Sequence, residues 1–368
     1  MEEKMNNHVL DKINLENYGL TEQFKEEANG YSNLFVARVS EQHRELYKVI
    51  AEKGELLAEV SGKFAFAADD NTVFPVVGDW VMIDRTEESA GNAVIHHVLS
   101  RKSLFERKAA GTGNGIQIVA ANFDLVFICM SLNADFNLRR LERYLSVAWD
   151  SMARPVIVLT KADLCDNLAE RLNQISAVRV GTDVVICSSQ DNRGYDEIAA
   201  YLSPGKTIVF LGSSGVGKST IINRLLGEDR LQTNDLRNDD RGRHTTTHRQ
   251  LLLLPTGGVV IDTPGMRELH LDHANLSKSF EDIEELAERC RFRDCTHTSE
   301  PGCAVKAAIE TGSLPQKRFD NYRKLQTEMD YEGLNYRQLE AAKIKKMFGS
   351  KGEMKQALSE AKNKKHHK

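Results

Sequence analysis

The stretch Gly212-Ser-Ser-Gly-Val-Gly-Lys-Ser219 fits the pattern G-x-x-x-x-G-K-[ST] and lies between the apolar run 207–211 and the amphipathic segment 219–226. Its glycines permit backbone N–H groups to turn inward around a phosphate, and the start of a helix adds partial positive charge. Lys218 supplies a full charge to the outer phosphates, and the Ser219 hydroxyl is a ligand for Mg²⁺. The sequence therefore predicts a nucleotide site that contains Gly212, Ser213, Ser214, Gly215, Val216, Gly217, Lys218, Ser219 and Thr220.

The chain around this loop alternates between apolar strands and amphipathic helices. Strands are expected at 124–130, 155–159, 184–187, 207–211 and 259–262, and a helix is expected at 138–149. Such alternation is typical of a doubly wound parallel sheet. We therefore expect a central α/β P-loop domain over residues 109–272.

A second phosphate motif, Asp262-Thr-Pro-Gly265, follows the strand expected at 259–262. The Asp262 carboxylate can organise Mg²⁺ through water, and the Gly265 N–H can meet a γ-phosphate. An ordinary Pro-Gly turn would explain the dipeptide but not its position. Between the two motifs, Arg241-Gly-Arg-His-Thr-Thr-Thr247 lies in a polar stretch that can order around Mg²⁺ and γ-phosphate. The sequence leaves open which threonine does this; the magnesium ligands predicted beside Ser219 are Thr246 and Thr247.

Guanine recognition is expected from Thr160-Lys-Ala-Asp163, which closes the strand at 155–159. In GTPases such a motif reads guanine, because the carboxylate accepts hydrogen bonds from the base while the Lys stem packs on the base face. Taken alone, the motif is equally typical of a helix start with Asp as its cap. Cys187-Ser-Ser189 resembles the companion loop, so Thr160, Lys161, Asp163, Ser188 and Ser189 are predicted to bind the base.

The order of these motifs is unusual, because the guanine motif precedes the phosphate loop. Neighbouring strands can keep their places when old termini are joined and the chain is opened elsewhere. We therefore expect a GTPase domain with circularly permuted motifs.

The segment before this domain contains five short apolar runs separated by glycines, at residues 35–39, 46–50, 56–60, 79–83 and 93–98. They predict a small β-barrel over 31–108, which fits an OB-fold or another five-stranded barrel. Residues 1–30 are expected to form a loosely attached arm or short helix. The basic stretch 101–108 suits a loop on phosphate or a solvated linker.

A metal centre is predicted by Cys290, Cys295, His297 and Cys303, spaced C-x₄-C-x-H-x₅-C. Three thiolates and one imidazole form a closed tetrahedral set suited to structural Zn²⁺. The alternative, three buried thiols near a histidine, is disfavoured by the polar neighbours Arg291, Arg293 and Asp294. Zinc would stabilise a small helical domain over 273–348. Cys129, Cys165 and Cys187 are expected in the core. A surface facing RNA is expected from the surrounding cations Arg289, Arg291, Arg293, Lys306, Lys317, Arg318, Arg323 and Lys324.

The net charge of −4, from 49 basic and 53 acidic residues, argues at first against a nucleic-acid partner. The charge is uneven, however, because residues 343–368 carry nine lysines and two glutamates. The basic tail 349–368 is either a polyanion contact or a solvated end. No apolar run is long enough to span a membrane, and the first residues lack a secretory pattern, so a cytoplasmic protein is expected.

Taken together, the barrel, T-K-A-D, G-S-S-G-V-G-K-S-T, G-R-H-T-T-T, D-T-P-G and the Cys/His cluster resemble the RsgA (YjeQ) family of circularly permuted GTPases. The likeness covers about residues 31–348 and includes Gly78-Asp-Trp80, residues 101–108 and Leu141-Glu-Arg-Tyr-Leu145. It implies a monomeric GTPase that uses GTP/GDP, Mg²⁺ and Zn²⁺. It also implies binding to the small ribosomal subunit and its rRNA late in assembly, with faster hydrolysis on the subunit. Thr160 replaces the usual Asn, and this implies weaker base binding.

Catalysis is the least determined part of this prediction, because Met266 stands where many GTPases carry the Gln that orients water. His244 is our candidate for that role, since an imidazole can orient water; a loop histidine on rRNA or solvent is the alternative. A zinc-stapled RNA-binding protein that uses GTP only as a slow switch is therefore the competing function. A tRNA-modifying GTPase is disfavoured because no segment remains for a further catalytic domain.

Overall fold

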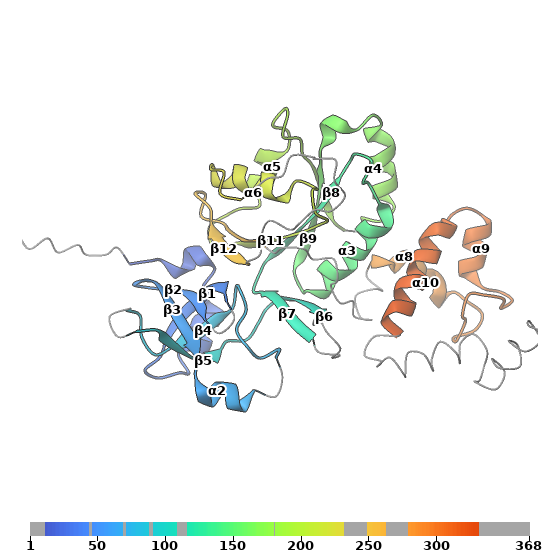
Figure 1. Ribbon diagram of the computed structural model, residues 1–368. Coiled ribbons are helices and arrows are strands. Elements are labelled where there is room, and N and C mark those ends of the chain that lie inside the picture. Colours follow the sequence, from blue (N-terminus) through green and yellow to red (C-terminus); the bar gives the residue numbers. More distant parts are fainter. Residues whose placement is uncertain are drawn as a thin grey trace, which may run out of the picture. The chain divides into compact units, whose positions relative to one another are not determined.

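The computed structural model of the chain describes residues 12–43, 46–68, 71–87, 91–108, 116–179, 181–231, 249–262 and 279–330. These residues form two compact units, one up to Lys108 together with Ile116–Glu281 and one that begins at Asp282 (Figure 1). The first unit contains a β-barrel and an α/β domain, and the second is helical. Among the helices in these ranges, none combines the length and apolar character that crossing a membrane requires.

The predicted barrel is confirmed, and every strand overlaps its expected range. Its strands are β1 (Phe35–Gln42), β2 (Tyr47–Ala51), β3 (Gly54–Val60), β4 (Trp80–Ile83) and β5 (Ala93–Val98). Antiparallel pairs β1–β2, β2–β3, β5–β4 and β4–β1, with the parallel pair β3–β5, close the sheet on itself. Alternate side chains fill the interior; Val39, Ala58 and Ile95 are fully buried there. This order fits the OB-fold. A short helix that the sequence did not predict, α2 (Gly62–Ala67), follows β3.

Residues 12–30 form short helices that pack against the barrel, so of the two alternatives the short helix is confirmed and the loosely attached arm is wrong for this part of the chain. They form η1 (Leu15–Tyr18) and α1 (Glu22–Ala28). Phe24 is buried, with its ring centroid 5.9 Å from that of Trp80. The Ile13 N–H also donates to the Glu52 carbonyl at 2.8 Å. The buried Phe24 ring and the Ile13 hydrogen bond thus attach this mostly polar segment to the barrel.

The basic stretch 101–108 is also more ordered than expected. Strands β6 (Leu104–Lys108) and β7 (Ile116–Ala121) pair antiparallel as a separate two-stranded sheet. The Arg101 guanidinium donates to both carboxylate oxygens of Asp79, at 2.8 and 2.7 Å, and the Asp79 side chain is completely buried. Arg101 is therefore a structural partner of Asp79 rather than a phosphate contact.

The α/β domain has the strand order β10-β9-β8-β11-β13-β12, and all its pairs are parallel except β12–β13. The strands are β8 (Leu125–Ser131), β9 (Arg154–Thr160), β10 (Asp183–Ile186), β11 (Thr207–Leu211), β12 (Gln250–Leu253) and β13 (Val259–Asp262). The helices are α3 (Leu138–Asp150), η3 (Ala162–Leu164), α4 (Leu168–Ser176), α5 (Tyr195–Ala199) and α6 (Lys218–Leu226). Figure 1 shows α5 and α6 on one face and α3 and α4 on the other. The doubly wound sheet is thus confirmed, with the antiparallel edge strand β12 as an addition.

The second unit contains α8 (Glu281–Glu288), α9 (Ala304–Glu310) and α10 (Gln316–Asp330). Arg318 holds α10 to α8, because its guanidinium donates to the two carboxylate oxygens of Asp282 at 2.8 and 2.7 Å. The Arg318 side chain is only 6% exposed. The prediction that Arg318 belongs to an RNA-facing surface is therefore wrong.

The barrel and the α/β domain meet at the fully buried Arg38 of β1. Its guanidinium lies 5.3 Å from the ring centroid of Trp80. It donates to the Gly78 carbonyl at 3.2 Å, the Asn122 carbonyl at 2.9 Å, the Thr207 hydroxyl at 2.9 Å and the Tyr18 carbonyl. Beside it, β1 pairs with β12 at Glu41 and Gln250 and so joins both domains in one eleven-stranded sheet.

We predict that Gly78→Ala destabilises this junction more than Gly91→Ala. Both glycines have positive φ, 95° and 90°, so both variants should lose about 1–2 kcal/mol to backbone strain. A Cβ at Gly78 would also lie 2.1 Å from the Ala121 carbonyl oxygen, whereas a Cβ at Gly91 would meet nothing within 4 Å. Gly78→Ala should therefore lose a further 1–3 kcal/mol, roughly, through overpacking. Urea unfolding followed by tryptophan fluorescence measures both losses; equal losses would contradict this view of the junction.

Candidate nucleotide site and metal centre

The phosphate loop runs from the end of β11 to the start of α6, as the sequence predicts. Strand β11 is buried along its whole length. At the first loop position a Cβ would lie 2.6 Å from the Cys129 carbonyl oxygen on β8, so Gly212 lets the loop start against the neighbouring strand. The last glycine of the motif, Gly217, has a left-handed φ of 101° and is the N-cap of α6. The backbone therefore requires glycine at both positions, for lack of space at Gly212 and for its positive φ at Gly217.

Lys218, the first residue of α6, lies inside the loop. Its ammonium donates to the Gly212 and Ser213 carbonyls, at 2.7 and 2.8 Å. Ser219 and Thr220 follow on the same turn and are partly exposed. The lysine charge is therefore already held at the point where the outer phosphates of a nucleotide are expected.

Asp262, at the end of β13, is the acidic member of the site. Its side chain is buried, and its Oδ2 atom has no hydrogen-bond partner among the described residues. Burial raises the pKa of Asp262, and the nearby Lys218 charge partly opposes this. A buried carboxylate oxygen without a partner is costly. The donor set of Asp262 and Ser219 fits a hydrated Mg²⁺, which would satisfy that oxygen.

The predicted guanine motif and the phosphate loop are in direct contact. Thr160, the last residue of β9, donates its hydroxyl to the Val216 carbonyl at 2.6 Å. Lys161 donates its ammonium to the Gly215 carbonyl at 2.8 Å. The Thr160 side chain is buried in this contact. From the sequence we expected only that Thr160 lacks the amide of the usual Asn, whereas its hydroxyl supports the phosphate loop.

The predicted companion loop lies beside Asp163. The Ser188 hydroxyl donates to Asp163 Oδ1 at 2.9 Å, and the Ala162 N–H donates to the Cys187 carbonyl at 3.2 Å. Ser188 is buried, whereas Asp163 and Ser189 are exposed. The fold thus brings the residues predicted to bind the base close together, and the Asp163 carboxylate among them is exposed.

The remaining predicted nucleotide residues lie outside the described residues. They are His244, Thr245, Thr246, Thr247, Gly265 and Met266.

Sequence reasoning assigned no role to Tyr144, although Leu141–Leu145 was part of the family likeness. The Tyr144 hydroxyl lies 3.3 Å from the Ser213 Oγ atom of the phosphate loop. Its spacing with Leu141 and Leu145 on α3 indicates only a buried helix face, so the sequence carried no signal for this contact.

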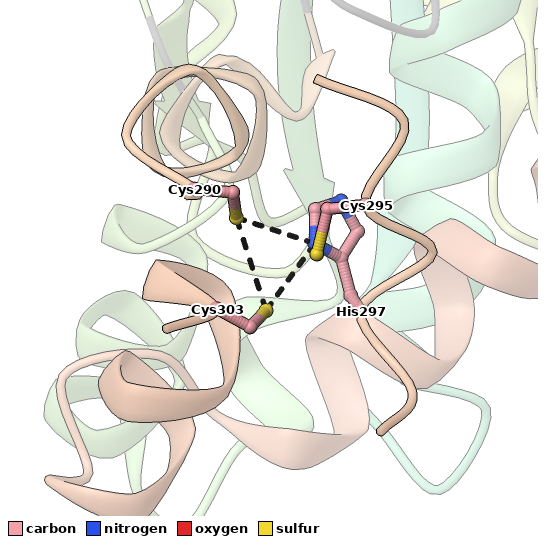
Figure 2. A group of neighbouring side chains, drawn as sticks. All are labelled: Cys290, Cys295, His297 and Cys303. Atoms are coloured by element: carbon pink, nitrogen blue, oxygen red, sulfur yellow. Dashed lines mark hydrogen bonds between the residues drawn. The ribbon is translucent and has the colours of Figure 1, made fainter. Parts of the chain in front are cut away.

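The predicted metal ligands converge in the second unit. One ligand atom from each of Cys290, Cys295, His297 and Cys303 lies within 4.8 Å of all the others. Figure 2 shows the three sulfur atoms and the imidazole pointing toward one another. The Sγ atoms of Cys290 and Cys303 are 3.8 Å apart, and His297 Nδ1 is 3.6 and 3.4 Å from them.

These separations fit a tetrahedral metal. Zn–S bonds of about 2.3 Å at tetrahedral angles place two sulfurs about 3.8 Å apart. Burial lowers the pKa of His297 and so favours the neutral imidazole that a metal ligand must be. The set therefore fits a structural Zn²⁺ with all four positions taken by protein. Of the cysteines expected in the core, Cys129 and Cys187 are buried and Cys165 is partly exposed.

A doubly wound sheet with a phosphate loop after one strand, and a guanine motif after a strand earlier in the chain, defines a circularly permuted P-loop GTPase. The RsgA GTPase family model matches residues 98–272. An ABC transporter model matches residues 195–362, a range that also includes the phosphate loop.

The family of the chain follows from its sequence identity to curated relatives. The chain is 53% identical to Small ribosomal subunit biogenesis GTPase RsgA 2 of Lactiplantibacillus plantarum, over 93% of this chain and 97% of the relative. It is 46% identical to RsgA 1 of Listeria innocua, over 86% of this chain and 90% of the relative. The chain belongs to the RsgA GTPase family.

Two solved structures are similar to this one. The crystal structure of YjeQ from Thermotoga maritima has a TM-score of 0.60 and 28% identity, over 80% of this chain and 98% of that one. The crystal structure of YloQ, a circularly permuted GTPase, has a TM-score of 0.56 and 26% identity, over 83% of this chain and 98% of that one. The permuted arrangement predicted from the motif order is thus confirmed.

We predict that Asp262→Asn removes the magnesium dependence of nucleotide binding. In EDTA, wild type and variant should bind GDP within about twofold of each other, whereas Mg²⁺ should tighten GTP binding only in wild type. GTP hydrolysis should fall about 100-fold or more. Asp84→Asn is the control, because Asp84 lies in the barrel and bonds to Arg85 and the Val94 N–H. Titration of fluorescent nucleotide measures the effect, and an unchanged magnesium response in Asp262→Asn would contradict the assignment.

We also predict that the purified chain carries one zinc ion. Replacing Cys290 and Cys303 together by Ser should remove most of the zinc, since two thiolates of a closed set are lost. The variant should also lower the unfolding temperature of the helical unit. Cys165→Ser, outside the cluster, should keep the full metal content. Elemental analysis by mass spectrometry measures it, and zinc retained in the double variant would refute the site.

Proposed function

We propose that this protein is a GTPase that binds the small ribosomal subunit late in its maturation and hydrolyses GTP to GDP and phosphate faster when bound. The observation that carries the proposal is the direct contact between the guanine motif and the phosphate loop, through Thr160 and Lys161. The contact supports a single site for base and phosphates. Relatives named small ribosomal subunit biogenesis GTPases, from bacteria and from Methanosarcina acetivorans, support the partner.

In the proposed base site, the Asp163 carboxylate accepts hydrogen bonds from the ring N–H and the exocyclic amine of guanine. The Ser188 hydroxyl holds one oxygen of that exposed carboxylate, and the other oxygen faces the base in this proposal. The backbone at Ser188 and Ser189 borders the base, and the Lys161 stem packs on its face. Adenine has neither a proton on N1 nor an amine at C2 and would leave the carboxylate unpaired, so the site rejects ATP.

In the proposed phosphate site, the Lys218 ammonium keeps its two loop carbonyls and donates its third N–H to the outer phosphates. The residues that would hold Mg²⁺ are Ser219 and Asp262, together with Thr246 or Thr247, and the ion would supply positive charge against the negative charge that develops on the phosphates. The Gly265 N–H meets the γ-phosphate. His244 orients the attacking water in place of the glutamine that Met266 replaces.

The proposed contribution of the Cys/His cluster is structural. Zn²⁺ held by Cys290, Cys295, His297 and Cys303 stabilises a helical unit too small to bury a large core. Exposed cations on this unit suit the phosphates of rRNA; they are Arg289, Arg291, Arg293, Lys317, Arg323 and Lys324.

The proposed domain limits follow the sequence. They are an N-terminal segment at 1–30, whose described part packs on the barrel, an OB-fold barrel at 31–108, the GTPase domain at 109–272, the zinc domain at 273–348 and a basic tail at 349–368. The tail is a second proposed contact with rRNA. We also propose that the protein is a cytoplasmic monomer.

The competing function is a zinc-stapled RNA-binding protein that uses GTP only as a slow switch. Met266 favours it, since a thioether cannot orient water. The intact set of Lys218, Ser219 and Asp262 favours turnover.

GTP hydrolysis with and without purified small ribosomal subunits tests the proposal. Subunits should raise the turnover number by at least about tenfold. ATP should be hydrolysed at least about 100-fold more slowly than GTP under the same conditions. Large subunits serve as the matched control and should have no effect. A rate that small subunits leave unchanged would refute the proposed partner and favour the slow switch.

A further inference from the structure

Tyr144 lies on the buried face of α3, close to the nucleotide site. The helix starts at an Asn137 cap, whose side chain accepts the Arg140 N–H at 3.1 Å. Its buried face includes Leu141, Tyr144 and Leu145, and the Tyr144 residue is only 5% exposed. The phenol hydroxyl nevertheless reaches a polar atom, the Ser213 hydroxyl, at 3.3 Å. The ring is thus held by packing while its hydroxyl touches the phosphate loop.

The residue that Tyr144 touches also holds the catalytic lysine. The Ser213 carbonyl accepts from the Lys218 ammonium at 2.8 Å. Thr160 and Lys161 bond to the second half of the loop, at Val216 and Gly215. Tyr144 of α3 contacts the first half of the loop, at Ser213. The loop is therefore anchored from outside at both halves, and α3 supplies the anchor nearer β11.

We propose that Tyr144 is a positioning residue for the phosphate loop. Its hydrogen bond to Ser213 fixes the peptide whose carbonyl holds Lys218, so that the loop is already formed when a nucleotide arrives. A loop formed in advance loses less conformational entropy on binding. The benefit is the same for GTP, GDP and the transition state, because all three use the same loop. This inference rests on the proposed nucleotide site and concerns affinity rather than the chemical step.

The test is Tyr144→Phe, which keeps the ring and removes only the hydroxyl. The KM for GTP and the Kd for GDP should both rise about two- to tenfold, the range that one neutral hydrogen bond supports. The turnover number should stay within about twofold of wild type, since uniform binding energy is lost. Tyr201→Phe is the matched control, because that hydroxyl bonds to Asp183, away from the loop, and should leave both constants unchanged. A lower turnover number with an unchanged KM would overturn the proposal.

A double-mutant cycle with Ser213→Ala separates positioning from simple packing. If the two hydroxyls act through one hydrogen bond, the double variant should bind GDP no more weakly than the weaker single variant. Losses that multiply in the double variant would overturn the proposal. Wild-type protein that bound no GTP or GDP would overturn the proposed function and this inference together, whereas normal wild-type binding with independent losses overturns the inference alone.

Discussion

The structure of the first unit depends on one buried cation, Arg38. Burial lowers its pKa to about 10, against the opposing charges of Asp124 and Asp79, so the guanidinium stays protonated at neutral pH. A buried charge is tolerated only when its donors are satisfied. Here the acceptors come from Tyr18, Gly78, Asn122 and Thr207, four segments that are far apart in the sequence. Satisfying one side chain thus requires the N-terminal segment, the barrel and the α/β sheet to be assembled together.

The same contact positions the nucleotide site. Thr207 is the first residue of β11, and the phosphate loop begins one residue after that strand ends. Within the loop itself, Thr160 and Lys161 attach Val216 and Gly215 to β9, and Tyr144 attaches Ser213 to α3. The loop therefore takes its position from several elements of the fold, although its own sequence is mostly small and polar.

The features predicted well from sequence were those whose signal is local. The glycines of the phosphate loop, the alternating apolar residues of the barrel and the spacing of Cys290 to Cys303 each require particular residue types at particular positions. The errors arose where a partner distant in sequence decides the outcome. Arg101 and Arg318 look like solvent-facing cations until Asp79 and Asp282 are placed beside them. Strand β12 is four residues long and pairs antiparallel at the edge of the domain, so the parallel-sheet pattern did not indicate it.

Strand β12 has neighbours on both sides, β13 and β1. Gln250 is paired with Asp262 in one direction and with Glu41 of the barrel in the other. A sideways displacement of β12 would therefore disturb its pairing with the barrel strand β1 as well as its pairing with β13. A mechanical load on β1 would reach Asp262 through a single intervening residue, Gln250. The barrel is thus connected, through neighbouring strands of one sheet, to the residue proposed to hold Mg²⁺.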